Sequence, residues 1–347
     1  MIRLLVQRKR GVRSNKLVAI ALILAAAGFT PDPWAGSDER SAEEPNVDLS
    51  DRVARLEARL NEERREEAID RGAVIHARVC AACHGRLGEG DGPGAAELHP
   101  WPRDFKTGKY RTRSTLSGEM PRQADIETVV RRGMPGTSMP QFEGLLSENQ
   151  IADVVTFILT LGPPRPSGIE PAALTIPEIP APDATSLSDG RAVYLVLGCW
   201  KCHGLDGSGR GPSARGLESD EGQPIRPRDF RYDPFKGGRS PETVVRAALS
   251  GLIGTPMPSH AEILVIPREA IDFYAESIPV QARSDLDDFR RNAPLAADVL
   301  ELEDDAWQEL RDENLVSLAH YVLSLSRREG FAFRLFRQEP ELEGRRP

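Results

Sequence analysis

The feature that most constrains this chain is a pentapeptide that contains all of its cysteines. Residues 80–84 read CAACH and residues 199–203 read CWKCH. The pattern C-x-x-C-H is typical of c-type haem attachment, in which two thiols bond the porphyrin and the histidine ligates the iron. We therefore predict two covalently bound haem c groups with their iron. The predicted attachment residues are Cys80, Cys83, Cys199 and Cys202, and the predicted iron ligands are His84 and His203.

The surroundings of the two motifs also repeat, in the same order. Each motif is followed by a glycine-rich loop that ends in Gly-Pro, then by Pro-Arg-Asp-Phe, Glu-Thr-Val-Val-Arg and Gly-Thr-x-Met-Pro. Each half then ends in an apolar helical pattern. So many ordered matches do not arise by chance. They indicate a tandem duplication with one haem in each unit.

The domain boundaries follow from the composition of the chain. A proline-rich stretch over 163–185 cannot hold a long helix and favours an extended, semi-rigid linker. The predicted parts are a first domain over 68–162, this linker, a second domain over 186–327, and a tail over 328–347.

Two further segments lie outside the repeat. Residues 49–67 predict a charged helix before the first domain, either solvated or a short coiled-coil or docking helix. The second unit contains an insertion over about 261–308, between its Met-Pro motif and its final helix. The acidic clusters of this insertion are expected to be solvated surface.

The N-terminus has the layout of an export signal. Six basic residues and no acidic one precede an apolar run over 17–29, which two prolines follow. This run is shorter than the ~20 apolar residues of a usual spanning helix. We predict a signal peptide or signal anchor over 1–30, which places the rest of the chain in the periplasm, either soluble or anchored to the cytoplasmic membrane.

The charge of the chain excludes one class of partner. The formal net charge is −8. Nucleic-acid binding depends on cationic side chains that neutralise phosphates, so we expect no nucleic-acid partner. An acidic surface suits a protein partner with a basic face.

Two methionines are the predicted sixth ligands of the irons. Met139 lies 55 residues after His84, and Met257 lies 54 after His203. A soft thioether favours ferrous iron and raises its potential. The matched spacing argues against Met134, whose counterpart is a leucine, and against methionines that merely fill the core.

Histidines are the rival ligands for this position. The candidates have no matched partner in the other repeat or lie on the attachment helix itself, so we expect them to be surface or packing residues. They are His76, His99, His260 and His320.

Each loop also offers residues that support the haem. A ligating histidine needs a hydrogen-bond acceptor for its other ring nitrogen, and we predict the carbonyls of Pro93 and Pro212 for this role. Arg103 and Arg228 have two interpretations: they pair with haem propionates, or they contact the adjacent aspartate in a turn.

These motifs together resemble the class I cytochromes c, and the duplication resembles an exported bacterial dihaem cytochrome c. The resemblance covers 68–162 and 186–327. It implies an all-α fold of two tandem cytochrome c domains, each wrapped round one covalent haem. In each domain the attachment helix crosses the final helix. The implied helix pairs are 67–82 with 151–161, and 190–202 with 315–325.

Electron transfer is the predicted function, because two irons with both axial positions filled leave none open for substrate. The chain is then a carrier, not an enzyme, whose partners are a protein redox donor and acceptor. It is either diffusible or a redox subunit of a respiratory complex or periplasmic oxidoreductase. The alternative is a dihaem cytochrome c peroxidase, which needs one displaceable sixth ligand.

Overall fold

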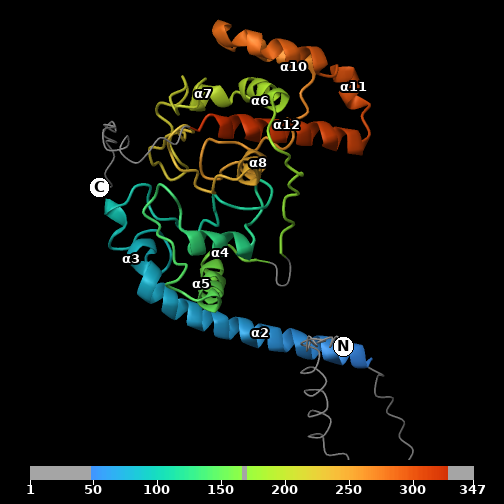
Figure 1. Ribbon diagram of the computed structural model, residues 1–347. Helices are drawn as coiled ribbons and strands as arrows, with labels where there is room; N and C mark the ends of the chain where they lie inside the picture. The colour runs from blue at the N-terminus through green and yellow to red at the C-terminus, as the bar shows by residue number, and fades with distance from the viewer. Residues whose placement is uncertain (1–47, 166–169, 327–347) are drawn as a thin grey trace, which may run out of the picture. The chain divides into compact units, whose positions relative to one another are not determined.

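The computed structural model describes residues 48–165 and 170–326, and these are helical without a β-strand (Figure 1). The prediction of an all-α fold is confirmed for this part of the chain. The predicted signal segment over 1–30 and the tail from 328 lie outside the described residues. No helix within the described ranges is both long enough and apolar enough to cross a membrane.

The helices of the first repeat surround its attachment motif. In chain order they are α2 (Leu49–Ile75), the π-helical turn η1 (His76–Cys80), α3 (Ala81–His84), the 3-10 turn η2 (Ala95–Glu97), α4 (Gln123–Arg132) and α5 (Glu148–Leu161). The chain separates into two compact units at Glu57 and Ala58, within α2. In the first unit the described residues are the start of α2, where Leu49, Val53 and Leu56 are exposed.

The helices of the second repeat are more numerous. They are α6 (Ala184–Val196), α7 (Cys199–His203), α8 (Pro241–Ser250), α9 (Arg268–Ala275), the 3-10 turn η3 (Val280–Leu286), α10 (Asp287–Asn292), α11 (Ala296–Leu300) and α12 (Asp304–Ser324). The proline-rich residues 170–183 contain no helix. Asp183 ends this stretch as the N-cap of α6, where its carboxylate accepts the Ser186 amide at 2.7 Å.

A close crossing of α2 and α5 builds the first core. A Cβ on Gly72 would lie 2.1 Å from the carbonyl oxygen of Asp153, so only glycine allows the two helices to approach this closely. Arg71 secures the crossing with two hydrogen bonds to the Asp153 carboxylate, at 2.7 and 3.0 Å. The buried side chains beside it are Phe105, Ile126, Val130, Ile151, Val154, Val155 and Ile158.

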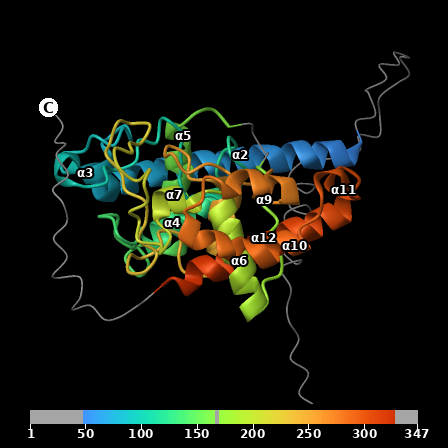
Figure 2. The ribbon, with the colours of Figure 1, turned by 90° about the horizontal axis from the view of Figure 1, so that it is seen from above.

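The second core repeats this crossing with α6 and α12, which lie side by side (Figures 1 and 2). A Cβ on Gly190 would lie 1.9 Å from the carbonyl oxygen of Ser317. The rings of Tyr194 and Tyr321 meet edge to face at 5.3 Å beside this contact. Both helix pairs expected from the family resemblance are therefore in contact.

The insertion forms short helices and a longer final helix. The family resemblance implied a final helix over 315–325, but α12 begins at Asp304. Asp304 and Asp305 stand in its first turn, where carboxylates interact favourably with the helix dipole, and this explains the earlier start. Ile271, Ile278 and Leu286 anchor the insertion in the second core.

Candidate functional site

Each attachment motif lies on a short helix that ends at a glycine. Residues 80–84 run from the last residue of η1 through α3, and 199–203 form α7. The helices end at Gly85 and Gly204, with φ of 78° and 79°, a conformation that favours glycine. The four cysteines are free thiols, so none is used in a disulfide.

The two motif histidines are held in the same way. Nδ1 of His84 lies 3.0 Å from the carbonyl oxygen of Arg103, and Nδ1 of His203 lies 3.1 Å from that of Arg228. A ring that donates from Nδ1 keeps Nε2 as the lone-pair nitrogen, which is the arrangement a metal ligand needs. Burial lowers the pKa of both imidazoles, which favours this neutral form.

The prediction that Pro93 and Pro212 supply these carbonyls is wrong. The glycine before each proline turns back onto the attachment helix: Gly92 donates its amide to Cys83 O at 3.1 Å, and Gly211 to Cys202 O at 3.0 Å. The Gly-Pro turns thus satisfy the open carbonyls at the end of the helix. The chain comes beside the histidine only later, at the Pro-Arg-Asp-Phe motif.

An aromatic stack fixes each imidazole from one side. Phe105 stacks on His84 at 4.5 Å and Phe230 on His203 at 4.2 Å, between ring centroids. A second ring follows five residues later in each repeat, Tyr110 on Phe105 at 6.1 Å and Phe235 on Phe230 at 5.6 Å. Sequence reasoning missed these outer rings, although their shared five-residue spacing was visible.

The first thiol of each motif is not activated as a nucleophile. Burial raises the pKa of the Cys80 thiol to about 11 and that of Cys199 to about 12. Reactive cysteines instead have a lowered pKa. The raised pKa values of these two thiols argue against a role of Cys80 and Cys199 in thiol redox chemistry.

Met139 and Met257 occupy equivalent turns. The amide of Met139 donates to Thr137 Oγ1 at 3.2 Å, and that of Met257 donates to Thr255 Oγ1 at 3.3 Å. The carbonyl of Met139 accepts from Met134 N, and that of Met257 from Leu252 N, both at 3.1 Å. Both methionines are half-buried and belong to neither buried core cluster, which argues against a core-filling role.

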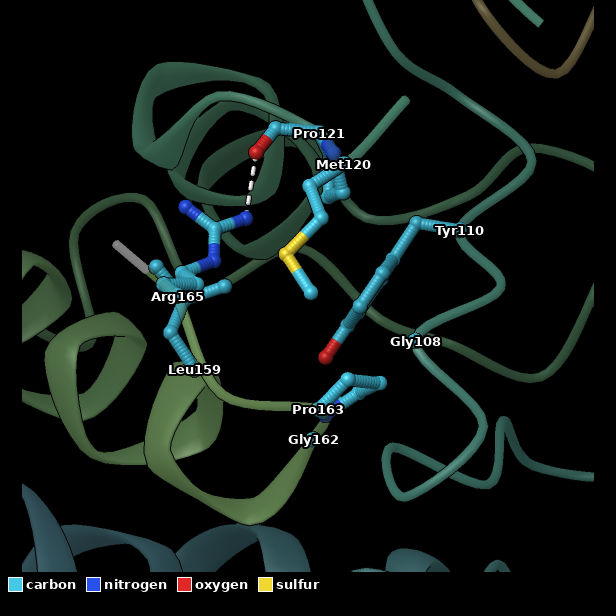
Figure 3. Close-up of a pocket in the computed structure, with 8 residues that line it drawn as sticks. All are labelled: Gly108, Tyr110, Met120, Pro121, Leu159, Gly162, Pro163 and Arg165. Atoms are coloured by element: carbon cyan, nitrogen blue, oxygen red, sulfur yellow. Dashed lines mark hydrogen bonds between the residues drawn. The ribbon is translucent and has the colours of Figure 1, made fainter. Parts of the chain in front are cut away.

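Another methionine, Met120, lines a small cavity in the first repeat (Figure 3). Its sulfur and the hydroxyl of Tyr110 point into the same space, and Arg165 donates to the carbonyl of Pro121 at its edge. Tyr110 is the outer ring of the stack on His84, so this cavity adjoins the aromatic stack of the first site.

The remaining histidines are placed as packing or surface residues. His76 is 1% exposed and packs against Phe157, at 5.2 Å between ring centroids. His320 ties α12 to the proline-rich linker, with Nε2 3.0 Å from Pro180 O. His260 is buried and His99 is exposed.

Within the described residues, the guanidinium of Arg103 does not contact the adjacent Asp104. Arg103 instead pairs with Glu221 at 2.8 Å, and Arg228 lies 3.7 Å from Asp233. Asp104 accepts the amide of Lys106 at 2.8 Å. The propionate interpretation of both arginines stays a prediction.

Histidine in place of either sixth-ligand methionine is expected to lower the potential of one haem. Imidazole favours ferric iron more than thioether does, so Met139→His and Met257→His should each shift one step of a two-step redox titration downward by about 60 mV or more, tenfold or more in the equilibrium constant. Met134→Leu is the control, because leucine stands at its counterpart Leu252. Two unchanged steps in both histidine variants would mean that other residues ligate the irons.

The residues present fit covalently bound haem: paired free thiols, a neutral imidazole with Nε2 available, and a thioether turn. The sequence pattern of the cytochrome c family matches residues 69–162. The chain is also similar to a solved chain of the reducing HAO-like protein complex from Kuenenia stuttgartiensis, with 31% sequence identity and a TM-score of 0.58. The similarity covers 74% of this chain and 96% of that chain. No curated protein matches the sequence.

Proposed function

Because this chain belongs to the cytochrome c family, we propose that it carries electrons through two covalently bound haems, one in each repeat. The second haem is supported by one observation: the geometry around the first motif histidine recurs in the second repeat. The contact from Nδ1 to a carbonyl, at 3.0 and 3.1 Å, and the stacked phenylalanine recur around His203. The two domains, 68–162 and 186–327, and the linker 163–185 are part of this proposal.

In each repeat, the cysteines, the histidine and the methionine have different roles in binding the haem. When bound, the haem supplies the one-electron change at its iron. The two cysteines would hold it covalently, and the histidine nitrogen and the methionine sulfur would ligate its iron. The carbonyls of Arg103 and Arg228 keep each imidazole in one tautomer and orientation, which limits rearrangement between oxidation states.

We propose that the chain works as the redox subunit of a protein complex outside the cytoplasm. The solved neighbour comes from a protein complex, which supports a protein redox partner. The insertion of the second repeat leaves apolar side chains on its surface, which suits contact with another protein. They are Ile263, Phe273, Tyr274, Val280, Leu295 and Leu300. Residues 17–29 are the proposed export signal or membrane anchor.

A redox titration of the purified protein, combined with a haem assay, tests this function. We expect two haems per chain, two reversible one-electron steps and low-spin spectra in both states. Peroxide with an oxidisable donor is expected to give no turnover above that of free haem. Peroxidase turnover, or one high-spin haem, would instead support the dihaem peroxidase. Release by osmotic shock without detergent would argue against a membrane anchor.

A further inference from the structure

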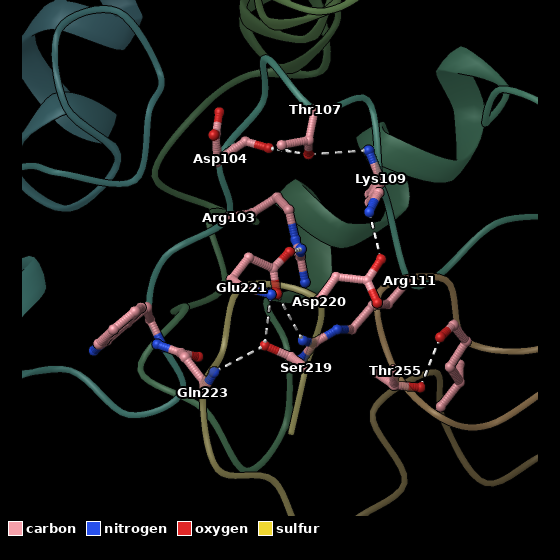
Figure 4. A network of polar contacts seen from close by, with 12 residues as sticks. Arg103, Asp104, Thr107, Lys109, Arg111, Ser219, Asp220, Glu221, Gln223 and Thr255 are labelled. Atoms are coloured by element: carbon pink, nitrogen blue, oxygen red, sulfur yellow. Dashed lines mark hydrogen bonds and ion pairs between the residues drawn. The ribbon is translucent and has the colours of Figure 1, made fainter. Parts of the chain in front are cut away.

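A turn of the second repeat contacts the first repeat, where Glu221 pairs with Arg103 and Asp220 pairs with Lys109 (Figure 4). The segment before Pro-Arg-Asp-Phe is six residues longer in the second repeat, 15 from Pro212 to Pro227 against 9 from Pro93 to Pro102. The extra residues form the turn 218–224, closed by Ser219 N donating to Gln223 O at 2.8 Å. Glu221, at its tip, is the partner of Arg103.

The contact is reciprocal between the two repeats. The Arg103 guanidinium lies 3.8 Å from a Cβ built on Gly254, in the loop before Met257. The Arg228 guanidinium lies 3.2 Å from a Cβ built on Gly136, in the loop before Met139. The backbone carbonyl of each arginine thus contacts the motif histidine of its own repeat. Its guanidinium lies beside the methionine loop of the other repeat.

Four cationic side chains gather at this contact, and we call them the basic cluster: Arg103, Arg111, Arg228 and Lys236. The arginine side chains are 19%, 11% and 23% exposed, and Lys236 is half-buried. Glu221 lies 2.8 Å from Arg103 and 3.9 Å from Arg111. Lys236 forms no ion pair with any residue that the structure describes.

Burial and the repulsion between these cations lower the pKa values of two of the four side chains. Burial, followed by the charges of Arg228, Arg111 and Arg103, lowers the pKa of Lys236 to about 8. Burial and the charge of Arg103 lower the pKa of Arg111 to about 10. Cations that repel one another in a partly buried place are stabilised by an anion, and guanidinium groups suit carboxylates in particular.

We propose that the basic cluster is one shared binding site for carboxylate groups, at which the propionates of both haems are held. This inference rests on the proposed function, because it requires a haem in each repeat. The reciprocal placement of Arg103 and Arg228 is the reason for assigning the cluster to both haems. The charge of the cluster then acts on both irons.

Lys236→Gln in the haem-loaded protein tests the shared site. Loss of one cation disfavours reduction, which adds negative charge to the iron. We expect the ratio of reduced to oxidised haem at a fixed potential to fall by ~3- to 10-fold at both haems, where tenfold is 59 mV. Lys236→Arg keeps the charge and should retain both potentials. Lys106→Gln is the matched control, because Lys106 is an exposed lysine paired with Glu89 outside the cluster.

Each other outcome overturns the proposal. A shift at one haem only would show that the cluster serves one site, and no shift at either would show that it holds no propionate. Potentials of the unaltered protein that differ between phosphate and chloride at constant ionic strength would identify a solvent anion instead. If Lys236→Gln does not fold, Arg111→Gln gives the same test. A haem content of one per chain would contradict the proposed function itself, separately from the cluster.

Discussion

Replacing both Cys199 and Cys202 with alanine is expected to lower the covalent haem content from two per chain to one. Both thioether bonds of the second site are then lost, and His203 alone does not retain the group covalently. The measurement is the mass of the intact chain, together with haem staining after denaturing electrophoresis. Retention of two covalent haems in this variant would contradict the assignment of the second motif.

The same variant is expected to destabilise the second repeat strongly. Cys199 packs against the second core, next to buried Trp200 and the α6–α12 pair, so a missing haem leaves an unfilled space there. Cavities in a packed core cost ~24 cal/mol per Å³, which for a haem-sized space exceeds the stability of most domains. We expect loss of helical circular dichroism together with the haem.

The matched control is the double alanine variant at Cys80 and Cys83. It should remove the other haem and leave the spectrum and potential step of the second site in place. A loss of both haems from either variant would mean that the repeats do not fold separately. Retention of one distinct haem in each variant would assign the two potential steps to the two motifs.

Gly190→Val is expected to have the second large effect, a loss of more than ~3 kcal/mol in the free energy of unfolding. Helix propensity alone favours alanine over glycine inside α6 by ~0.5–1 kcal/mol, and valine over glycine by less. The close contact between α6 and α12 outweighs this preference, because a Cβ on residue 190 would lie 1.9 Å from Ser317 O and 2.8 Å from Tyr321 Cβ. The helices would have to separate, and the packing of α6 on α12 would be lost. Chemical denaturation followed by circular dichroism measures the effect.

Ser188→Ala on the same helix is the control for this substitution. Ser188 is exposed, so alanine should be neutral or slightly stabilising through helix propensity. Gly72→Val provides the counterpart in the first repeat, where a Cβ would lie 2.1 Å from Asp153 O. Unfolding midpoints equal to that of the unaltered protein in both valine variants would show that the crossings are looser than the structure has them.

Side-chain chemistry is the part of the site that could be predicted before the structure. Cysteine, histidine and methionine have few substitutes as haem ligands, so their spacing in a repeat identifies them without tertiary information. The same applies to the all-α fold, which the family resemblance of these motifs implied and which is confirmed for the described residues. The second haem and the domain limits stay predictions.

Backbone partners could not be predicted in the same way. Every residue carries a carbonyl, so the sequence alone did not distinguish Pro93 from Arg103 as the acceptor for His84. The choice depends on where the chain returns after the glycine loop, and the hydrogen bonds of that loop to the attachment helix decide it. The early start of α12 at Asp304 was missed because the insertion has no counterpart in the first repeat.

The sequence by itself determined which residues are the candidates for haem attachment and ligation, and that their pattern occurs twice. Local spacing is sufficient for this, because haem attachment requires two thiols and a histidine within five residues. Only the tertiary structure decided how the repeats meet. Arg103 and Arg228 are equivalent in sequence, yet each has its guanidinium beside the methionine loop of the other repeat. A contact between segments about 90 to 150 residues apart depends on packing, which no local pattern encodes.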